Sequence, residues 1–142
     1  MILVDTGPLV ALCDPRDGLN RVALRDLDRL ARRALVVCDG VLAECCFHLP
    51  HPVQRTRLAR LLQALALRPY EHAGEADLQV EVFDWLLKYA EHEPDWVDGW
   101  LAVVAGREKR WKVWTYDAEF RTTWRRPDGT RIPLAALVPA RA

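Results

Sequence analysis

The first eight residues constrain the fold more than any other part of this 142-residue chain. Three apolar residues at positions 2–4 are followed at once by the sequence Asp-Thr-Gly-Pro at positions 5–8. A short apolar run with β-branched residues that ends in a Gly-Pro turn predicts a buried strand. Pro8 fits the first turn of a helix, because its missing N–H would have no partner there anyway. The chain therefore begins with a strand that leads through Asp5 and a tight turn into a helix.

Short apolar strands and amphipathic helices alternate along the rest of the chain. We expect strands at residues 34–38 and 112–115, an edge strand at 67–70 because it contains Pro69, and a short last strand at 131–134. Helices are expected at 19–33, from Asp39 as the N-cap, from residue 52, at 75–91 and at 95–109. This alternation predicts a single domain over residues 1–142 with the α/β class. Its architecture would be three layers, α/β/α, with a short central parallel sheet.

Composition limits the class of protein to which the chain can belong and its expected location. About half of the residues, 51%, are hydrophobic, which is enough for a real core. The net charge of zero argues neither for nor against a nucleic-acid partner. The four cysteines lack metal-ligand spacing and have apolar neighbours, so we expect reduced core residues. No apolar run approaches the ~20 residues of a membrane span, and the N-terminus lacks signal-peptide features, so a soluble, cytoplasmic protein is expected.

Four acidic residues occupy positions where a parallel sheet places its functional side chains. Asp5 and Asp117 each follow a predicted strand, and the carboxyl ends of neighbouring parallel strands meet at one edge of the sheet. Glu44 lies on the helix after the second strand. Asp98 lies near the start of an apolar helix, where an unpaired charge is costly to bury. Asp95 is a fifth candidate that can share a face with Asp98, although the N-cap role is favoured for it.

The four acids together predict a metal site. Any one of them alone is also compatible with a turn residue, a helix cap or an exposed helical residue. Crowded carboxylates repel one another, and their oxygens suit hard cations such as Mg²⁺ or Mn²⁺. Thr6 and Thr115 lie beside site acids in the sequence, where a hydroxyl can hydrogen-bond a carboxylate or a metal-bound water.

Four motifs carry a resemblance to the PIN-domain family. The opening Ile-Leu-Val-Asp-Thr-Gly-Pro-Leu resembles the strand that delivers the first metal-site Asp of that family, and Leu-Ala-Glu at 42–44 resembles its helical Glu. The segments at 97–105 and 115–120 resemble its third and fourth acidic motifs. Their order and spacing match from Met1 to about Leu137. Gly99 stands where Ala is usual, and Cys45-Cys46 follows Glu44 where polar or branched residues are usual, but no acid is missing.

The resemblance implies a function and partners. PIN domains of this kind are Mg²⁺- or Mn²⁺-dependent ribonucleases, and many short ones are VapC-type toxins of toxin–antitoxin pairs. The resemblance thus implies that Asp5, Glu44, Asp98 and Asp117 are catalytic and hold the metal, with Asp95 as a less certain ligand. It further implies an RNA substrate, a cognate antitoxin and a homodimer.

In such an enzyme a metal-activated water attacks a phosphodiester in line. Nearby basic side chains can bind the flanking phosphates of RNA, and the candidates closest to Asp117 are Arg121, Arg125 and Arg126.

Two other functions are weighed against the ribonuclease. A phosphatase of the haloacid dehalogenase type also opens with a strand and an Asp, but it needs a second Asp two residues later, where this chain has Gly7. A catalytically silent PIN-like module that only binds RNA or protein is the remaining alternative. Loss of one of the acids would mark it, and all four are present.

Overall fold

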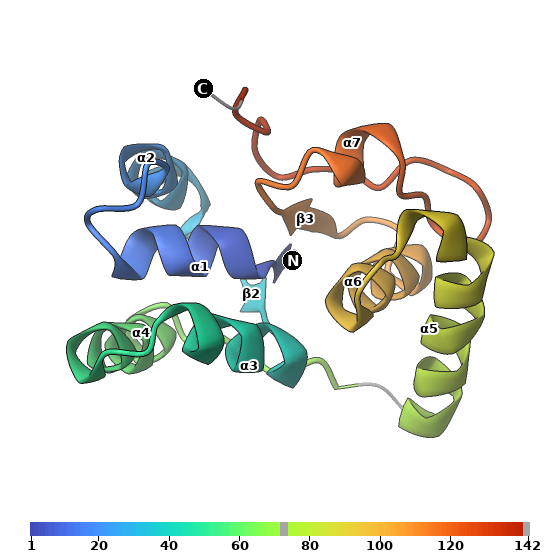
Figure 1. Ribbon diagram of the computed structural model, residues 1–142, viewed down its shortest axis with the longest axis horizontal. Coiled ribbons are helices and arrows are strands. Elements are labelled where there is room, and N and C mark those ends of the chain that lie inside the picture. The colour runs from blue at the N-terminus through green and yellow to red at the C-terminus, as the bar shows by residue number, and fades with distance from the viewer. Residues whose placement is uncertain (72–73, 141–142) are drawn as a thin grey trace.

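Three short parallel strands form the centre of the molecule (Figure 1). The structure is a computed structural model that describes residues 1–71 and 74–140. The strands β1 (Ile2–Val4), β2 (Leu35–Val36) and β3 (Lys112–Trp114) lie in the order β2-β1-β3. Ile2 pairs with Leu35 on one side and with Lys112 on the other. The first strand is therefore the central one, and Asp5 follows directly at its carboxyl end.

Helices cover both faces of this sheet, which confirms the predicted three-layer α/β/α arrangement. The helices α1 (Thr6–Cys13), α2 (Asn20–Leu30), α3 (Asp39–His48) and α4 (Pro52–Ala64) lie on one side in Figure 1. On the other side lie α5 (Glu75–Lys88), the 3₁₀ turn η1 (Ala90–His92), α6 (Trp96–Arg107) and the short α7 (Glu119–Thr122). Within the described residues, no helix combines the length and the apolar character that a transmembrane span needs.

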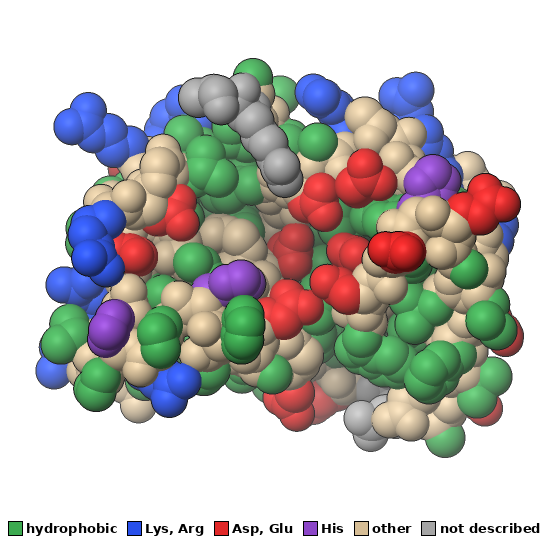
Figure 2. Space-filling view, viewed as in Figure 1, with side chains coloured by type: hydrophobic (Ala, Val, Ile, Leu, Met, Phe, Trp, Pro, Cys, Tyr) green, Lys and Arg blue, Asp and Glu red, His purple; other side chains and the backbone are tan. Residues whose placement is uncertain are grey.

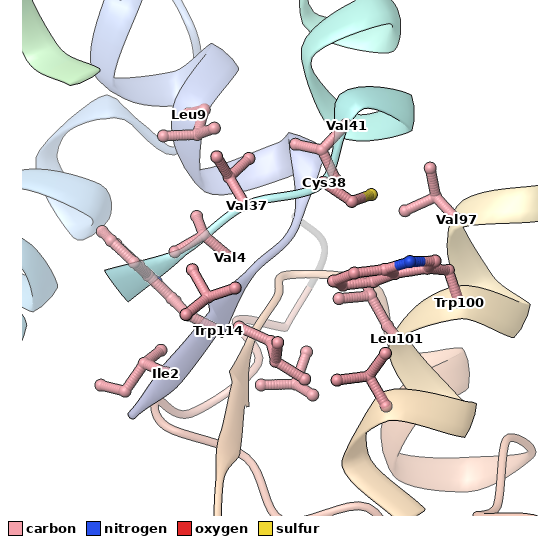
Figure 3. Close-up of a cluster of buried hydrophobic side chains, with 14 of the residues drawn as sticks. Ile2, Val4, Leu9, Val37, Cys38, Val41, Val97, Trp100, Leu101 and Trp114 are labelled. Atoms are coloured by element: carbon pink, nitrogen blue, oxygen red, sulfur yellow. The ribbon is translucent and has the colours of Figure 1, made fainter. Parts of the chain in front are cut away.

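The sheet and the inner faces of the helices enclose one hydrophobic core (Figure 3). Val4 from β1 and Trp114 from β3 are fully buried, and Leu101 of α6 packs against the sheet from the other layer. Cys13, Cys38 and Cys45 are buried and Cys46 is partly buried, all as free thiols. The expectation of reduced cysteines in the core is thus confirmed for three of them.

The edges of the sheet differ from the prediction. The second strand covers two residues rather than 34–38, and the expected edge strand at 67–70 is only a single bridge between Val36 and Arg68. The last expected strand is likewise a bridge between Val113 and Leu134. Strands of two or three residues offer few backbone N–H and C=O groups for pairing. The segments around Arg68 and Leu134 therefore each form a single bridge to the sheet and no longer strand.

Several helix boundaries also differ, and the helix expected over 19–33, for example, ends at Leu30. Cys38 occupies the N-cap of α3, and Asp39 is its first residue rather than its cap. The helix expected over 75–91 ends at Lys88, and the chain continues as a 3₁₀ turn to Glu93, whose backbone φ is +49°. A left-handed residue after a helix reverses the chain, and here the reversal lets α6 pack back along α5.

Gly99 allows this close packing of α6 against α5. A Cβ at this position would lie 3.0 Å from Val82 Cγ1 and 3.2 Å from Trp85 Cε3. We therefore expect Gly99→Ala to lower the free energy of unfolding by about 1 kcal/mol, because the cost of displacing these packed α5 side chains, about 1–3 kcal/mol, exceeds the gain in helix propensity of about 1 kcal/mol. Urea denaturation measures the change. Gly18→Ala is the control, since no atom lies within 4 Å of its added Cβ, and equal effects of the two substitutions would contradict the packing argument.

Candidate active site

Acidic side chains gather in the middle of one face of the molecule, between α1 and α3 on one side and α6 on the other (Figure 2). Hydrogen bonds through Thr6 and Thr115 link three of the acids, which are Glu44, Asp5 and Asp117. Asp95 and Asp98 cap each other at the start of α6. Repulsion from Asp95 raises the pKa of Glu44, and repulsion from Asp5 and Asp117 raises that of Asp98, so the two groups lie close to each other. The five acids come from the end of β1, from α3, from the start of α6 and from the segment after β3. The structure thus brings together all the acids that the sequence singled out.

Asp5 is buried at the carboxyl end of β1 and also caps α1. Its side chain is only 8% exposed. Oδ1 accepts a hydrogen bond from the backbone N–H of Thr6 at 2.7 Å, and Oδ2 accepts one from the Thr115 hydroxyl at 2.7 Å. Burial raises the pKa of Asp5 from 3.8 to about 6, and the charges of Glu44 and Asp117 add to this, while the two hydrogen bonds oppose it.

Glu44 points from α3 toward α1. The Thr6 hydroxyl donates a hydrogen bond to its Oε2 at 2.6 Å. Burial is the largest cause of the raised pKa of Glu44, and the neighbouring Asp95 carboxyl raises that pKa further. Thr6 therefore links two of the acids, since its N–H binds Asp5 and its hydroxyl binds Glu44.

Asp95 and Asp98 form a reciprocal cap at the start of α6. Asp95 Oδ1 accepts from the Asp98 N–H at 2.9 Å, and Asp98 Oδ2 accepts from the Asp95 N–H at 3.0 Å. The favoured N-cap interpretation of Asp95 is confirmed. Burial raises the pKa of Asp98 to about 8, followed by repulsion from Asp95, Asp5 and Asp117. Asp98 thus lies where a negative charge is most costly.

Thr115 joins the acids at the ends of β1 and β3. Its hydroxyl donates to Asp5 and accepts a hydrogen bond from the backbone N–H of Asp117 at 3.0 Å. Asp117 Oδ1 in turn accepts from the N–H of Glu119 at the start of α7. The hydrogen bonds expected from Thr6 and Thr115 to carboxylates are therefore present in the structure.

The acids are close but do not yet form a complete ligand cage. Among residues 1–71 and 74–140, no three Asp, Glu, His or Cys side chains have the spacing of a ready-made metal site. Both oxygens of Asp5 and Oδ2 of Asp98 accept hydrogen bonds from the chain itself. Binding one cation to several of these acids would therefore require their side chains to turn inward.

The three arginines after Asp117 differ in their surroundings. Arg121 is exposed at the end of α7. Arg125 is partly buried and donates to the carbonyls of Trp124 and Thr122. Arg126 is 9% exposed, and its guanidinium donates to the Lys109 carbonyl at 2.7 Å. This burial makes Arg126 a structural residue in this conformation, so the structure does not favour the RNA contact expected of it.

The sequence interpretation missed a buried polar network beside the site. Asp26 of α2 is 2% exposed, and its Oδ2 accepts a hydrogen bond from the Tyr116 hydroxyl at 2.9 Å. That hydroxyl also accepts from Trp114 Nε1, and Arg29 donates to Asp26 at 3.2 Å. Tyr116 lies between Thr115 and Asp117, so the network anchors the site loop to α2. The sequence signal for this network is the position of Asp26, a charged residue on the same helix face as the apolar residues Ala23 and Leu30.

Comparisons with known proteins support the fold. Neither a protein-family model nor a curated protein matches the sequence. Among solved structures, the chain is similar to the crystal structure of VapC20 from Mycobacterium tuberculosis, described as a sarcin-ricin loop cleaving toxin. The TM-score is 0.67 at 24% sequence identity, over 85% of this chain and 93% of that chain. The chain therefore has a PIN-like fold of the VapC kind.

Proposed function

We propose that this chain is a metal-dependent endoribonuclease, the toxin component of a type II toxin–antitoxin pair. The observation that carries the proposal is the cluster of five carboxyl groups, delivered by four separate segments to one face. The fold supports the proposal as well, because the chain is similar in structure to VapC20, which is described as a sarcin-ricin loop cleaving toxin. The catalytic residues in this proposal are Asp5, Glu44, Asp98 and Asp117.

A divalent cation such as Mg²⁺ or Mn²⁺ fits this donor set. All the groups involved offer hard oxygen atoms. Burial and mutual repulsion raise the pKa of Asp5, Glu44 and Asp98, and within the described part of the chain none of them forms an ion pair with Lys or Arg. A cation would relieve this uncompensated charge. Asp5, Glu44, Asp98 and Asp117 would hold it, with Asp95 as a further ligand once its capping bond opens.

The residues of the chain then have distinct roles. When bound, the cation would lower the pKa of a water and offset charge on the phosphate. Asp5 and Asp117 would be kept in place by the Thr115 hydroxyl, and Glu44 by the Thr6 hydroxyl. Exposed Arg121, near Asp117, would contact a flanking phosphate of the RNA, with partly buried Arg125 as a weaker candidate. With an RNA substrate and an antitoxin partner, the proposed activity would be cytoplasmic.

A cleavage assay tests the proposal directly. Purified protein is incubated with a sarcin-ricin loop hairpin, chosen because VapC20 is described as cleaving that loop, and with an unrelated hairpin of equal length. Cleavage is expected in Mn²⁺ or Mg²⁺ and is expected to disappear with excess EDTA, because the acids alone cannot activate water. Cleavage that persists in EDTA would exclude the metal mechanism. Absence of cleavage of any RNA, with binding retained, would favour the silent PIN-like module.

A further inference from the structure

Helix α2 carries a row of arginines on its exposed side. Arg21, Arg25 and Arg29 follow one another at intervals of four residues, so they share one face of the helix, and all three are exposed. Among residues 20–30, all of which the structure describes, Asp28 is the sole exposed acid. Figure 2 shows Lys and Arg side chains at the upper left, where Figure 1 places α2, on the face that also holds the acids. Positive charge therefore prevails on this helix.

A buried carboxylate holds two of these arginines at one point. Asp26 is 2% exposed, and its Oδ1 lies 3.5 Å from Arg25 Nη2 and 3.2 Å from Arg29 Nη2. Because both guanidiniums reach the same oxygen, they lie side by side at the surface. The side chains of Arg25 and Arg29 remain 69% and 59% exposed, so most of the five N–H donors of each guanidinium face solvent. We call Arg25, Asp26 and Arg29 together the Arg25–Arg29 clamp.

The clamp carries more positive charge than Asp26 requires. A buried carboxylate needs a counter-charge, and one guanidinium supplies it. The second arginine leaves this point of the surface with a net positive charge. Exposed ion pairs contribute little to stability, so stability alone does not account for the second arginine. Guanidiniums held in a fixed orientation match the oxygen atoms of a phosphate, which they bind with paired hydrogen bonds. The clamp is therefore suited to a phosphate group.

Hydrogen bonds connect the clamp to the candidate active site. Asp26 Oδ2 accepts a hydrogen bond from the Tyr116 hydroxyl at 2.9 Å, and Tyr116 directly precedes Asp117. The backbone N–H of Asp117 donates to the Thr115 hydroxyl, which in turn donates to Asp5. The carboxylate that orients the two guanidiniums thus also holds the segment that carries Asp117. A phosphate in the clamp would therefore lie at a defined position relative to the acids.

We propose that the Arg25–Arg29 clamp binds a backbone phosphate of the RNA substrate, away from the bond that is cleaved. This inference rests on the proposed function, which makes RNA the substrate. The clamp would hold the strand on the α2 side of Asp117, and Arg121 would contact it on the α7 side. Phosphate contacts position a nucleic acid without reading its sequence, so the clamp would contribute to the binding of any RNA that enters the site.

RNA binding without cleavage tests the clamp. The sarcin-ricin loop hairpin, labelled with a fluorophore, is titrated with protein in EDTA, and fluorescence anisotropy measures the Kd over a range of salt concentrations. Arg25→Gln with Arg29→Gln is expected to raise the Kd at least 10-fold at low salt. The slope of log K against log salt concentration should become shallower by about 1–2, because fewer counterions are released from the RNA. An unchanged Kd and slope would overturn the inference.

A second double variant controls for net charge. Arg110→Gln with Lys112→Gln removes the same charge from two exposed residues at the amino end of β3, whereas Asp117 follows its carboxyl end. This variant should change the Kd far less than the clamp variant. Equal losses in the two double variants would show that net charge, and not the clamp, governs RNA binding, which would also overturn the inference.

A measurement on the unchanged protein covers the case in which the clamp variant fails to fold, since Asp26 loses its counter-charges there. Phenylglyoxal modifies exposed guanidiniums, and mass spectrometry identifies the modified residues. Bound RNA should slow the modification of Arg25 and Arg29 several-fold and leave that of exposed Arg110 unchanged. Equal reactivity of Arg25 and Arg29 with and without RNA would contradict the proposed contact.

Cleavage kinetics separate this inference from the proposed function. The clamp variant should raise KM more than it lowers kcat, because the clamp does not touch the reacting bond. RNA binding that depends on the clamp, without cleavage in Mn²⁺, would overturn the proposed nuclease activity alone. Cleavage with a KM that the clamp variant leaves unchanged would overturn this inference alone.

Discussion

Asp5→Asn is expected to lower the rate of RNA cleavage by about 100- to 1,000-fold, the cost typical of removing a key electrostatic group from an active site. Asparagine keeps the size of the side chain and an oxygen that can accept from the Thr6 N–H. It removes a negative charge that lies close to those of Glu44 and Asp117. Single-turnover cleavage of the hairpin at saturating Mn²⁺ measures the loss, and circular dichroism confirms that the variant is folded.

Asp28→Asn is the matched control for this substitution. Asp28 is exposed on α2, outside the acid cluster. Its neutralisation should therefore leave both the stability and the cleavage rate nearly unchanged. Full activity of the Asp5→Asn enzyme would remove Asp5 from the catalytic site. A similar loss in both variants would point to an effect of net charge on RNA binding instead.

The stability of the metal-free protein is expected to fall as the pH rises from about 4 to about 8. The pKa of Asp98 in the folded chain is raised from 3.8 to about 8, and that of Asp5 to about 6. Between the unfolded and folded pKa values the folded state binds more protons, so deprotonation favours unfolding. Asp98→Asn removes the largest of these shifts and keeps an oxygen that can accept from the Asp95 N–H. Its Tm at pH 8.5 in EDTA should exceed that of the wild type by about 5 °C.

Thermal melts at pH 4.5 and pH 8.5 distinguish this effect from a general change in stability. The advantage of the Asp98→Asn protein should be small at pH 4.5, where the wild-type Asp98 is already protonated. Saturating Mn²⁺ should raise the Tm of the wild type at pH 8.5 and should raise that of the variant less, because a ligand stabilises only the state that binds it. If Asp98→Asn raised the Tm equally at both pH values, the charge of the Asp98 carboxylate would not be the cause of the stabilisation.

The parts of the structure that follow from local sequence signals were predictable. The apolar run before Asp5, the Pro at position 8 and the apolar helix around Asp98 predicted the first strand, the first helix and the largely apolar surroundings of Asp98. The expectation that Asp5 and Asp117 meet rested on the carboxyl ends of neighbouring parallel strands sharing one edge, which is a general property of such sheets. The strand order itself became known only from the structure. The resemblance of four motifs to one family added the expected chemistry.

The features of the fold and the site that could not be predicted depend on contacts between segments that are distant in the sequence. Nothing near Arg126 in the sequence shows that its guanidinium meets the Lys109 carbonyl, and the brief pairing of Arg68 and Leu134 with the sheet depends on the lengths of its strands. The link from Asp26 to Tyr116 spans 90 residues. Its location on an apolar helix face marked Asp26 as unusual, but its partner becomes apparent only when the fold brings α2 to the segment that follows β3.

The four acids come from separate parts of the chain, which couples the loss of activity to global unfolding. Asp5 and Asp117 follow neighbouring strands, Glu44 comes from the helical layer on one side, and Asp98 comes from the layer on the other side. No contiguous fragment shorter than residues 5–117 contains all of them, and separating either layer from the sheet disperses them. Catalytic competence should therefore disappear in a single step with global unfolding, so residual activity in urea would report the fraction of native molecules.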